Sequence, residues 1–209
     1  GDYTQAAREY NLVDAQAFNQ TRRAELFEET AAALRQTGAY SDALRIYDDI
    51  LAFAQYASYR ALVLYWQGDT LLQAGKTDEG SQRLLQAYQQ DPSSYGAFLA
   101  MQSLKQAGLE FLTGLEESWV YYNTGQYDLS QAALEQFLQS GGQETAETAY
   151  LQGLLAEKRG DYVMAIDRYE QAIELDTGGY YLAEAWLAKA RALAANGSDP
   201  TATYMTLSE

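Results

Sequence analysis

Adjacent carboxylates are the residues of this sequence with the most obvious catalytic chemistry. They occur as the pairs Glu28-Glu29, Asp48-Asp49 and Glu116-Glu117. A glycosidase uses two carboxylates that face one another across the bond to be cleaved. Neighbouring residues of an α-helix point about 100° apart, so such a pair cannot flank a bond by itself. We therefore interpret the three pairs as solvated helix faces.

The composition excludes several other kinds of site. The 209 residues contain no cysteine and no histidine, which removes thiolate nucleophiles, disulfides, the usual zinc sites and imidazole acid–base catalysis. The sequence also has no glycine-rich phosphate loop and no nucleophile elbow. We predict that this chain is not an enzyme and that it needs no cofactor and no metal ion.

Charge and hydrophobicity narrow the class of partner. The net charge of −15 repels nucleic-acid backbones and anionic membrane surfaces. Hydrophobic residues make up 47% of the chain, but they form no apolar run of the ~20 residues that a membrane span needs. We predict no nucleic acid and no membrane insertion. The acidity keeps an extended surface in solution, and a cationic partner is the alternative interpretation.

The sequence contains an internal repeat, and this repeat must position its polar and aromatic residues. A short motif recurs along the chain. It consists of a glycine, any residue and an aromatic residue, followed by a small residue, as in Gly38-Ala39-Tyr40 with Ala43. Glycine adopts positive φ and so ends one helix before the next begins. The spacings between successive turn glycines are 37, 37, 50, 35 and 37 residues. The series is Gly1, Gly38, Gly75, Gly125, Gly160 and Gly197.

Apolar residues on both sides of each turn follow a helical period. After the turn they recur at i, i+4, i+7 and i+8, as in Ala43, Tyr47, Ile50 and Leu51, which places them on one helix face. Before each turn a second apolar stripe contains a small residue seven positions ahead of the glycine. Such a residue lets two helices approach closely. The pattern therefore predicts antiparallel helix pairs and no strands.

This pattern resembles the tetratricopeptide repeat, most clearly over residues 64–92 and 149–172. The sequence departs from it at Gln67 and Gln152, where leucine is usual, and at Gly80 and Ser130, which replace alanine. The resemblance implies an all-α fold: an α-α superhelix, or solenoid, of about 11–12 helices. It also implies a scaffold that binds protein or peptide partners.

The repeat predicts one domain made of successive helix pairs. We expect residues 1–18 to form a second helix without its first, because Gly1 stands at a turn position. We infer a fragment of a longer protein, with possible self-association through this edge; a natural N-terminus is the alternative. The gap of 50 residues predicts an inserted helix at 93–108. The predicted pairs are residues 19–57, 58–92, 109–142, 144–177 and 180–209.

In tetratricopeptide arrays the first helix of each pair lines the concave face, where ligands usually bind. Tyrosine suits such a surface because it combines a large contact area, few rotatable bonds and a polar tip. The alternative is that each tyrosine packs between helices with its hydroxyl in water. Transferred by position, the candidate binding residues are Glu25, Glu28, Tyr65, Asp69, Tyr122, Asn123, Tyr150, Glu157 and Arg191.

A narrower resemblance covers about residues 20–200. The order of the segments 64–68, 91–97 and 119–127 is similar to the helical superhelix that precedes the catalytic domain of bacterial soluble lytic transglycosylases. That likeness implies a non-catalytic domain of a peptidoglycan-processing enzyme of the cell envelope, outside the cytoplasm. Its lysozyme-like catalytic domain would then lie beyond Glu209. A general protein-interaction module, cytoplasmic or not, is the other hypothesis.

Overall fold

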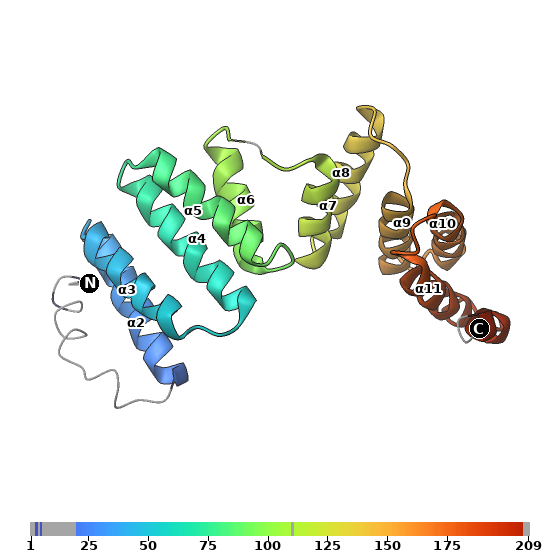
Figure 1. Cartoon of the computed structure of the whole chain (residues 1–209), viewed down its shortest axis with the longest axis horizontal. Coiled ribbons are helices and arrows are strands. Elements are labelled where there is room, and N and C mark those ends of the chain that lie inside the picture. The colour runs from blue at the N-terminus through green and yellow to red at the C-terminus, as the bar shows by residue number, and fades with distance from the viewer. Residues whose placement is uncertain (1–2, 4, 6–19, 110, 207–209) are drawn as a thin grey trace. The chain divides into compact units, whose positions relative to one another are not determined.

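Eleven α-helices and no strand occur in the residues that the structure, a computed structural model, describes: 3, 5, 20–109 and 111–206 (Figure 1). The predicted all-α fold is confirmed. Apart from residues 3 and 5, the helix and the self-association edge predicted at 1–18 lie outside the described residues. The helices are α2 Gln20–Gln36, α3 Tyr40–Phe53, α4 Ala57–Gln73, α5 Thr77–Gln90, α6 Tyr95–Gln106, α7 Gly114–Asn123, α8 Tyr127–Gln139, α9 Ala146–Lys158, α10 Tyr162–Leu175, α11 Leu182–Ala195 and α12 Thr201–Thr206.

The chain forms two compact units, residues 1–111 and residues 112–209. Unit 1 contains α2 to α6 and unit 2 contains α7 to α12. The single continuous repeat domain, with the pair boundaries given above, remains a prediction. Each described helix is too short or too polar to cross a bilayer.

The turn glycines end the first helix of each pair. Gly38 and Gly75 have φ of 76° and 77°, a conformation that residues with a side chain rarely adopt. The amide of the following residue, Ala39 or Lys76, then donates back to a carbonyl of the last helical turn, at 3.0 and 2.9 Å. This hydrogen-bonded cap reverses the chain within two residues, so that the second helix begins at once.

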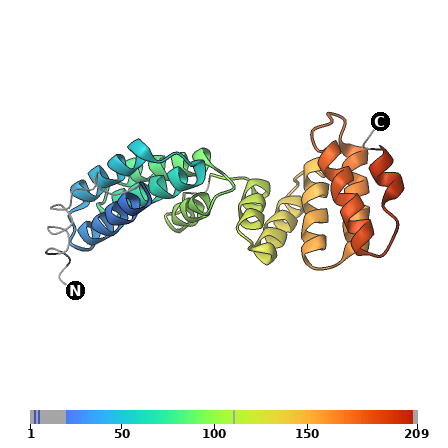
Figure 2. The same cartoon turned by 90° about the horizontal axis from the view of Figure 1, so that it is seen from below.

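Unit 1 is a stack of two helix pairs and one additional helix. α2 packs on α3 and α4 on α5, and α6 contacts both α4 and α5, as the blue to green ribbons show (Figures 1 and 2). The stripe residues Ala43, Tyr47 and Ile50 are buried together with Val63 of the next pair. Each pair therefore buries its apolar face against its neighbour.

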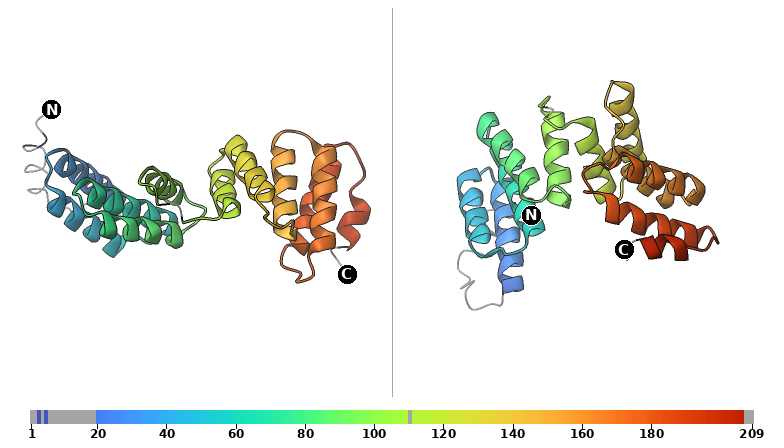
Figure 3. Two further views of the ribbon diagram at one scale, coloured as in Figure 1. Left: turned by 90° about the horizontal axis from the view of Figure 1, so that it is seen from above. Right: turned by 45° about the vertical axis from the view of Figure 1, so that its right-hand side comes forward.

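Unit 2 repeats this packing in α7/α8, α9/α10 and α11/α12 (Figure 3). The ring of Tyr169 lies against Gly153, where an added Cβ would come within 2.5 Å of Cε1. In α7/α8 the close contact is polar: Ser118 and Ser130 each donate to the other's backbone carbonyl at 2.8 Å. Serine can replace the usual alanine there because both buried hydroxyls are satisfied.

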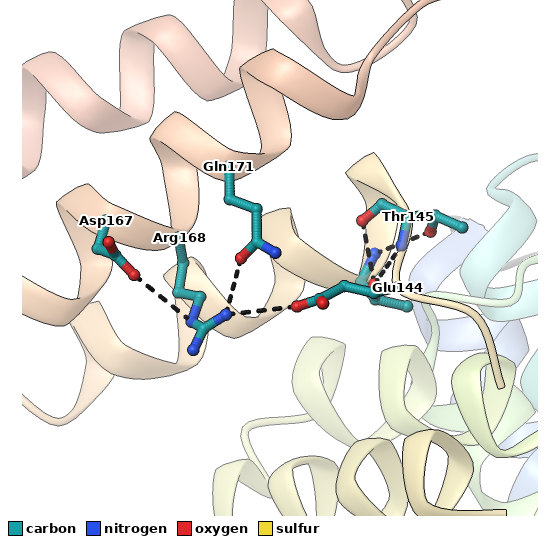
Figure 4. Close-up of polar contacts among 6 residues, drawn as sticks. Glu144, Thr145, Asp167, Arg168 and Gln171 are labelled. Atoms are coloured by element: carbon teal, nitrogen blue, oxygen red, sulfur yellow. Dashed lines mark hydrogen bonds and ion pairs between the residues drawn. The ribbon is translucent and has the colours of Figure 1, made fainter. Parts of the chain in front are cut away.

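Arg168 of α10 holds the loop that leads into α9 (Figure 4). Its Nη1 donates to Gln171 at 2.7 Å and to Glu144 at 3.4 Å. The next residue, Thr145, caps α9 through a reciprocal pair of hydrogen bonds with Thr148. The start of α9 is therefore fixed from two sides, and α9 carries the residues described next.

Candidate functional site

One pocket in unit 2 brings together four of the nine candidate residues. It has a volume of about 650 Å³ and lies between the first helices of three successive pairs, α7, α9 and α11, with one residue from α10. The candidates in it are Tyr122, Tyr150, Glu157 and Arg191, joined by Trp119, Leu154, Lys158 and Tyr162.

Aromatic rings form one wall of the pocket. The Trp119 ring packs edge-on against Tyr122, with centroids 5.8 Å apart, and lies 6.5 Å from Tyr150. Trp119 Nε1 donates to Glu147 at 2.8 Å, which fixes the orientation of the indole. Rings at these separations support one another and present a flat, rigid apolar surface. The wall is therefore formed before any ligand arrives.

A charged network closes the other side. Arg191 donates from Nε and Nη2 to the two carboxylate oxygens of Glu157, at 2.7 and 2.8 Å, and the Tyr169 hydroxyl donates to the same carboxylate at 2.7 Å. Burial acts to raise the pKa of Glu157, but these hydrogen bonds and the guanidinium charge outweigh it, so the pKa lies below 4.5. Glu157 is thus an ionised, fully bonded anchor for Arg191.

Lys158 lies over the rings of Tyr122 and Tyr127, with its ammonium 6.0 and 5.4 Å from their centroids. These are cation–π distances. Burial, followed by the neighbouring Tyr127 and Tyr150, raises the pKa of Tyr122 to about 12. The Tyr122 hydroxyl is therefore a neutral donor and acceptor throughout the physiological range.

Removing the charge of Glu157 should cost unit 2 stability in a pH-dependent way. Because its pKa is lower when folded, the carboxylate contributes stability that is fully present above pH 4.5 and lost as the pH falls below that value. Glu157→Gln should lower the unfolding free energy by about 1–2 kcal/mol at neutral pH, and by less in acid. Denaturant titrations of both chains at several pH values measure this difference.

The matched control is Glu174→Gln, which removes an exposed carboxylate from α10 of the same unit. It should change the unfolding free energy by no more than about 0.5 kcal/mol. A Glu157→Gln difference that grows as the pH falls would contradict the assignment.

The other five candidates lie elsewhere. Glu25 and Glu28 line a second pocket of about 400 Å³ in unit 1, formed by the start of α2 and the α3–α4 connection. The Tyr59 hydroxyl donates to Glu28 at 2.5 Å. Asp69 pairs with Arg35, and burial raises the pKa of the half-buried Tyr65. Neither Tyr65 nor Asp69 lines the second pocket, and the exposed Asn123 lines neither of the two.

The sequence reasoning missed four residues of the unit 2 pocket: Trp119, Leu154, Lys158 and Tyr162. Helical spacing could have found two of them. Trp119 precedes Tyr122 by three residues and Leu154 follows Tyr150 by four, and residues at these spacings share a helix face. Tyr162 belongs to a second helix, whereas all the candidate residues come from first helices. Within the described residues, no acidic cluster forms a metal site.

The model of the tetratricopeptide repeat family matches residues 115–180 and again 150–203. This part of the chain belongs to the tetratricopeptide repeat family. The two tetratricopeptide matches cover α7 to α11, the helices that form the pocket. No curated protein matches the chain.

Three solved structures illustrate what the chain is similar to. A MamA fragment from Desulfovibrio magneticus RS-1 has 16% identity over 88% of this chain and 92% of that chain, with a TM-score of 0.39. BtubC from P. vanneervenii has 14% identity over 99% of this chain and 88% of that chain, with a TM-score of 0.42. The TPR2AB domain of yeast Sti1, solved in complex with pHSP90, has 17% identity over 93% of this chain and 78% of that chain, with a TM-score of 0.39.

Proposed function

We propose that unit 2 is a non-catalytic scaffold that binds a segment of a partner protein in the pocket between α7, α9 and α11. The observation that carries this proposal is the pocket itself: a rigid aromatic wall opposite a fully bonded ion pair. Clefts of this volume with a few placed polar groups are the usual form of a binding site, and in this one polar groups supply more of the lining than apolar groups do. The family match supports a scaffold for protein interaction.

The aromatic wall of the pocket favours an apolar or aromatic side chain of the partner, and the polar groups opposite favour polar atoms beside it. Trp119, Tyr122 and Tyr150 are half-buried, so they already have part of their surface out of water and lose little rotational freedom on binding. Rigid aromatic residues of this kind dominate the energy of protein interfaces. Arg191, about half exposed and held in position by Glu157, can orient the peptide backbone of the partner through its three remaining N–H donors.

Binding should depend on Tyr150. We would select ligands for the whole chain from a displayed library of random peptides and measure the affinity of the best one by calorimetry. Tyr150→Ala should weaken that affinity about 30-fold, the usual loss at a central aromatic residue. Circular dichroism checks that the variant keeps its helix content.

Tyr95→Ala is the control, since it removes a 60% exposed tyrosine from unit 1. The Tyr95→Ala variant should bind the selected peptide with the same affinity as the parent chain. Equal losses in both variants, or selected peptides that bind Tyr150→Ala as tightly as the parent, would overturn the proposal.

Peptidoglycan is the second candidate ligand. The segment 119–127, on which the likeness to lytic transglycosylase superhelices partly depends, supplies two residues of the aromatic wall, Trp119 and Tyr122. In that case the chain would act in the bacterial cell envelope, and catalysis would belong to another domain. Retention on purified sacculi that is lost in Tyr150→Ala would favour this candidate. Release of soluble muropeptides by the chain itself would contradict a non-catalytic role.

A further inference from the structure

Two ion pairs occupy the same repeat positions with opposite polarity. In unit 1, Arg35 lies three residues before Gly38 and pairs with Asp69, six residues before the next turn glycine, Gly75. In unit 2, Glu157 lies three residues before Gly160 and pairs with Arg191, six residues before Gly197. Both pairs span 34 residues and join the first helices of neighbouring helix pairs.

A tyrosine takes part in each ion pair from an equivalent position. Tyr47 and Tyr169 both stand nine residues after the turn glycine of their pair, and both are buried. Burial acts to lower the pKa of Arg35 and the neighbouring Tyr47 acts to raise it, whereas Tyr169 donates a hydrogen bond to the Glu157 carboxylate. A phenol hydroxyl can accept from a guanidinium or donate to a carboxylate. The same residue type therefore supports a cation in unit 1 and an anion in unit 2.

Burial makes these charges sensitive to their neighbour. The side chains of Arg35, Asp69 and Glu157 are 17%, 24% and 17% exposed, while Arg191 is 52% exposed. A mostly buried charge that loses its partner, or meets one of the same sign, is strongly destabilising. A helix pair with the wrong sign at this position would thus be rejected, which is how repulsive contacts give specificity.

We propose that this tyrosine-supported ion pair determines which helix pair can stack next to which. The helix pair α2/α3 presents the cation Arg35, so it stacks on a helix pair that carries an acid at the facing position, as α4/α5 does with Asp69. The pair α9/α10 presents an acid and accepts a neighbour that carries a cation. Opposite polarity in the two units prevents an exchange of their similar helix pairs during folding, or between two copies of the chain. Misassembly of this kind is characteristic of repeat proteins.

The test inverts the polarity of unit 1 in the full chain, away from the proposed binding pocket. Arg35→Glu places two acids together, and Asp69→Arg places two guanidinium groups together. Each single variant should lower the folded-to-unfolded ratio about a hundredfold, measured by denaturant unfolding. The double variant should return to within about tenfold of the parent. It should not recover fully, because an acid near the C-terminal end of α2 faces the negative end of the helix dipole.

Tyr47→Phe tests the role of the hydroxyl. Tyr47→Phe should lower the folded-to-unfolded ratio about tenfold both in the parent and in the double variant, because a phenol hydroxyl can accept from a guanidinium and can equally donate to a carboxylate. The control is the same exchange in Arg22 and Glu25, an ion pair on the surface of α2 with side chains 58% and 52% exposed. It should change the folded-to-unfolded ratio by no more than about fivefold, which is the effect of an acid in the first turn of α2.

A double variant no more stable than the worse single variant would overturn the proposal. So would single variants as stable as the parent, because the position would then not discriminate between charges. A Tyr47→Phe change that costs stability in the parent but none in the double variant would also contradict the proposal, since the hydroxyl would then not serve both polarities.

Discussion

Replacing Gly96 with alanine should lower the unfolding free energy of unit 1 by about 1–2 kcal/mol. Gly96 is the second residue of α6 and lies directly on the backbone of α4: an added Cβ would come within 2.5 Å of Leu62 N and 2.6 Å of the Ala61 carbonyl carbon. A backbone cannot move aside as a side chain can, so α6 must shift away from α4. Overpacking of this kind costs about 1–3 kcal/mol, and here alanine's better helix propensity of about 1 kcal/mol offsets only part of it.

Hydrogen exchange and denaturant unfolding together measure this effect. Amides of α4 and α6 should lose protection in Gly96→Ala, while those of α9 and α10 should keep theirs, because stability in stacked repeats is local. Gly178→Ala is the matched control, since the nearest atom to its added Cβ is Asp176 Oδ1 at 4.0 Å. An unchanged unfolding midpoint for Gly96→Ala would show that α6 does not depend on this close approach.

Tyr169→Ala should destabilise unit 2 more than any change to a single residue of the pocket wall. Tyr169 has the largest fully buried side chain in the described part of the chain. Its ring fills the space over Gly153 and packs 5.8 Å from Tyr150, and its hydroxyl supports Glu157. Truncating a buried aromatic residue to alanine costs about 3–5 kcal/mol. The free energy of unfolding from denaturant titration measures it.

A graded series separates packing from hydrogen bonding at this position. Tyr169→Phe retains the ring and should cost about 1–2 kcal/mol, because only the bond to Glu157 is lost. Tyr180→Ala removes a tyrosine that is 79% exposed and should stay within about 0.5 kcal/mol of the parent. If Tyr169→Phe were as unstable as Tyr169→Ala, the hydroxyl rather than the ring would carry the stability of this core.

Local patterns in the sequence were enough to predict the helices. A glycine with positive φ ends each first helix, as at Gly38, Gly75 and Gly160. The residue type alone indicates these turns, because glycine adopts positive φ far more readily than other residues do. The stripe of Ala43, Tyr47 and Ile50 is buried as its period predicts. Both signals act over one or two helical turns, and antiparallel pairing follows from a short connection between two such stripes.

The candidate site could be predicted only in part. The first helices all expose the same face, but the side chains that surround this face differ from one helix pair to the next. The positions of Tyr122, Tyr150, Glu157 and Arg191 follow from the repeat, and these four meet in one pocket. Glu28 has the same position as Tyr150, ten residues before its turn glycine, but lines another pocket together with Glu25, and Asp69 is used in an ion pair. The repeat assigns a helix face, and the side chains of the adjacent pair decide whether that face remains open.

The sequence by itself therefore determined that this protein is built of antiparallel helix pairs, and where each pair turns. Only the tertiary structure decided which residues 28 to 34 positions apart meet, such as Trp119 with Glu147 and Arg191 with Glu157. The physical reason is the range of the forces involved. Helix period and glycine conformation act between near neighbours, whereas a pocket or a buried ion pair depends on how one pair packs on the next, where side-chain volume and charge sign are matched across helices.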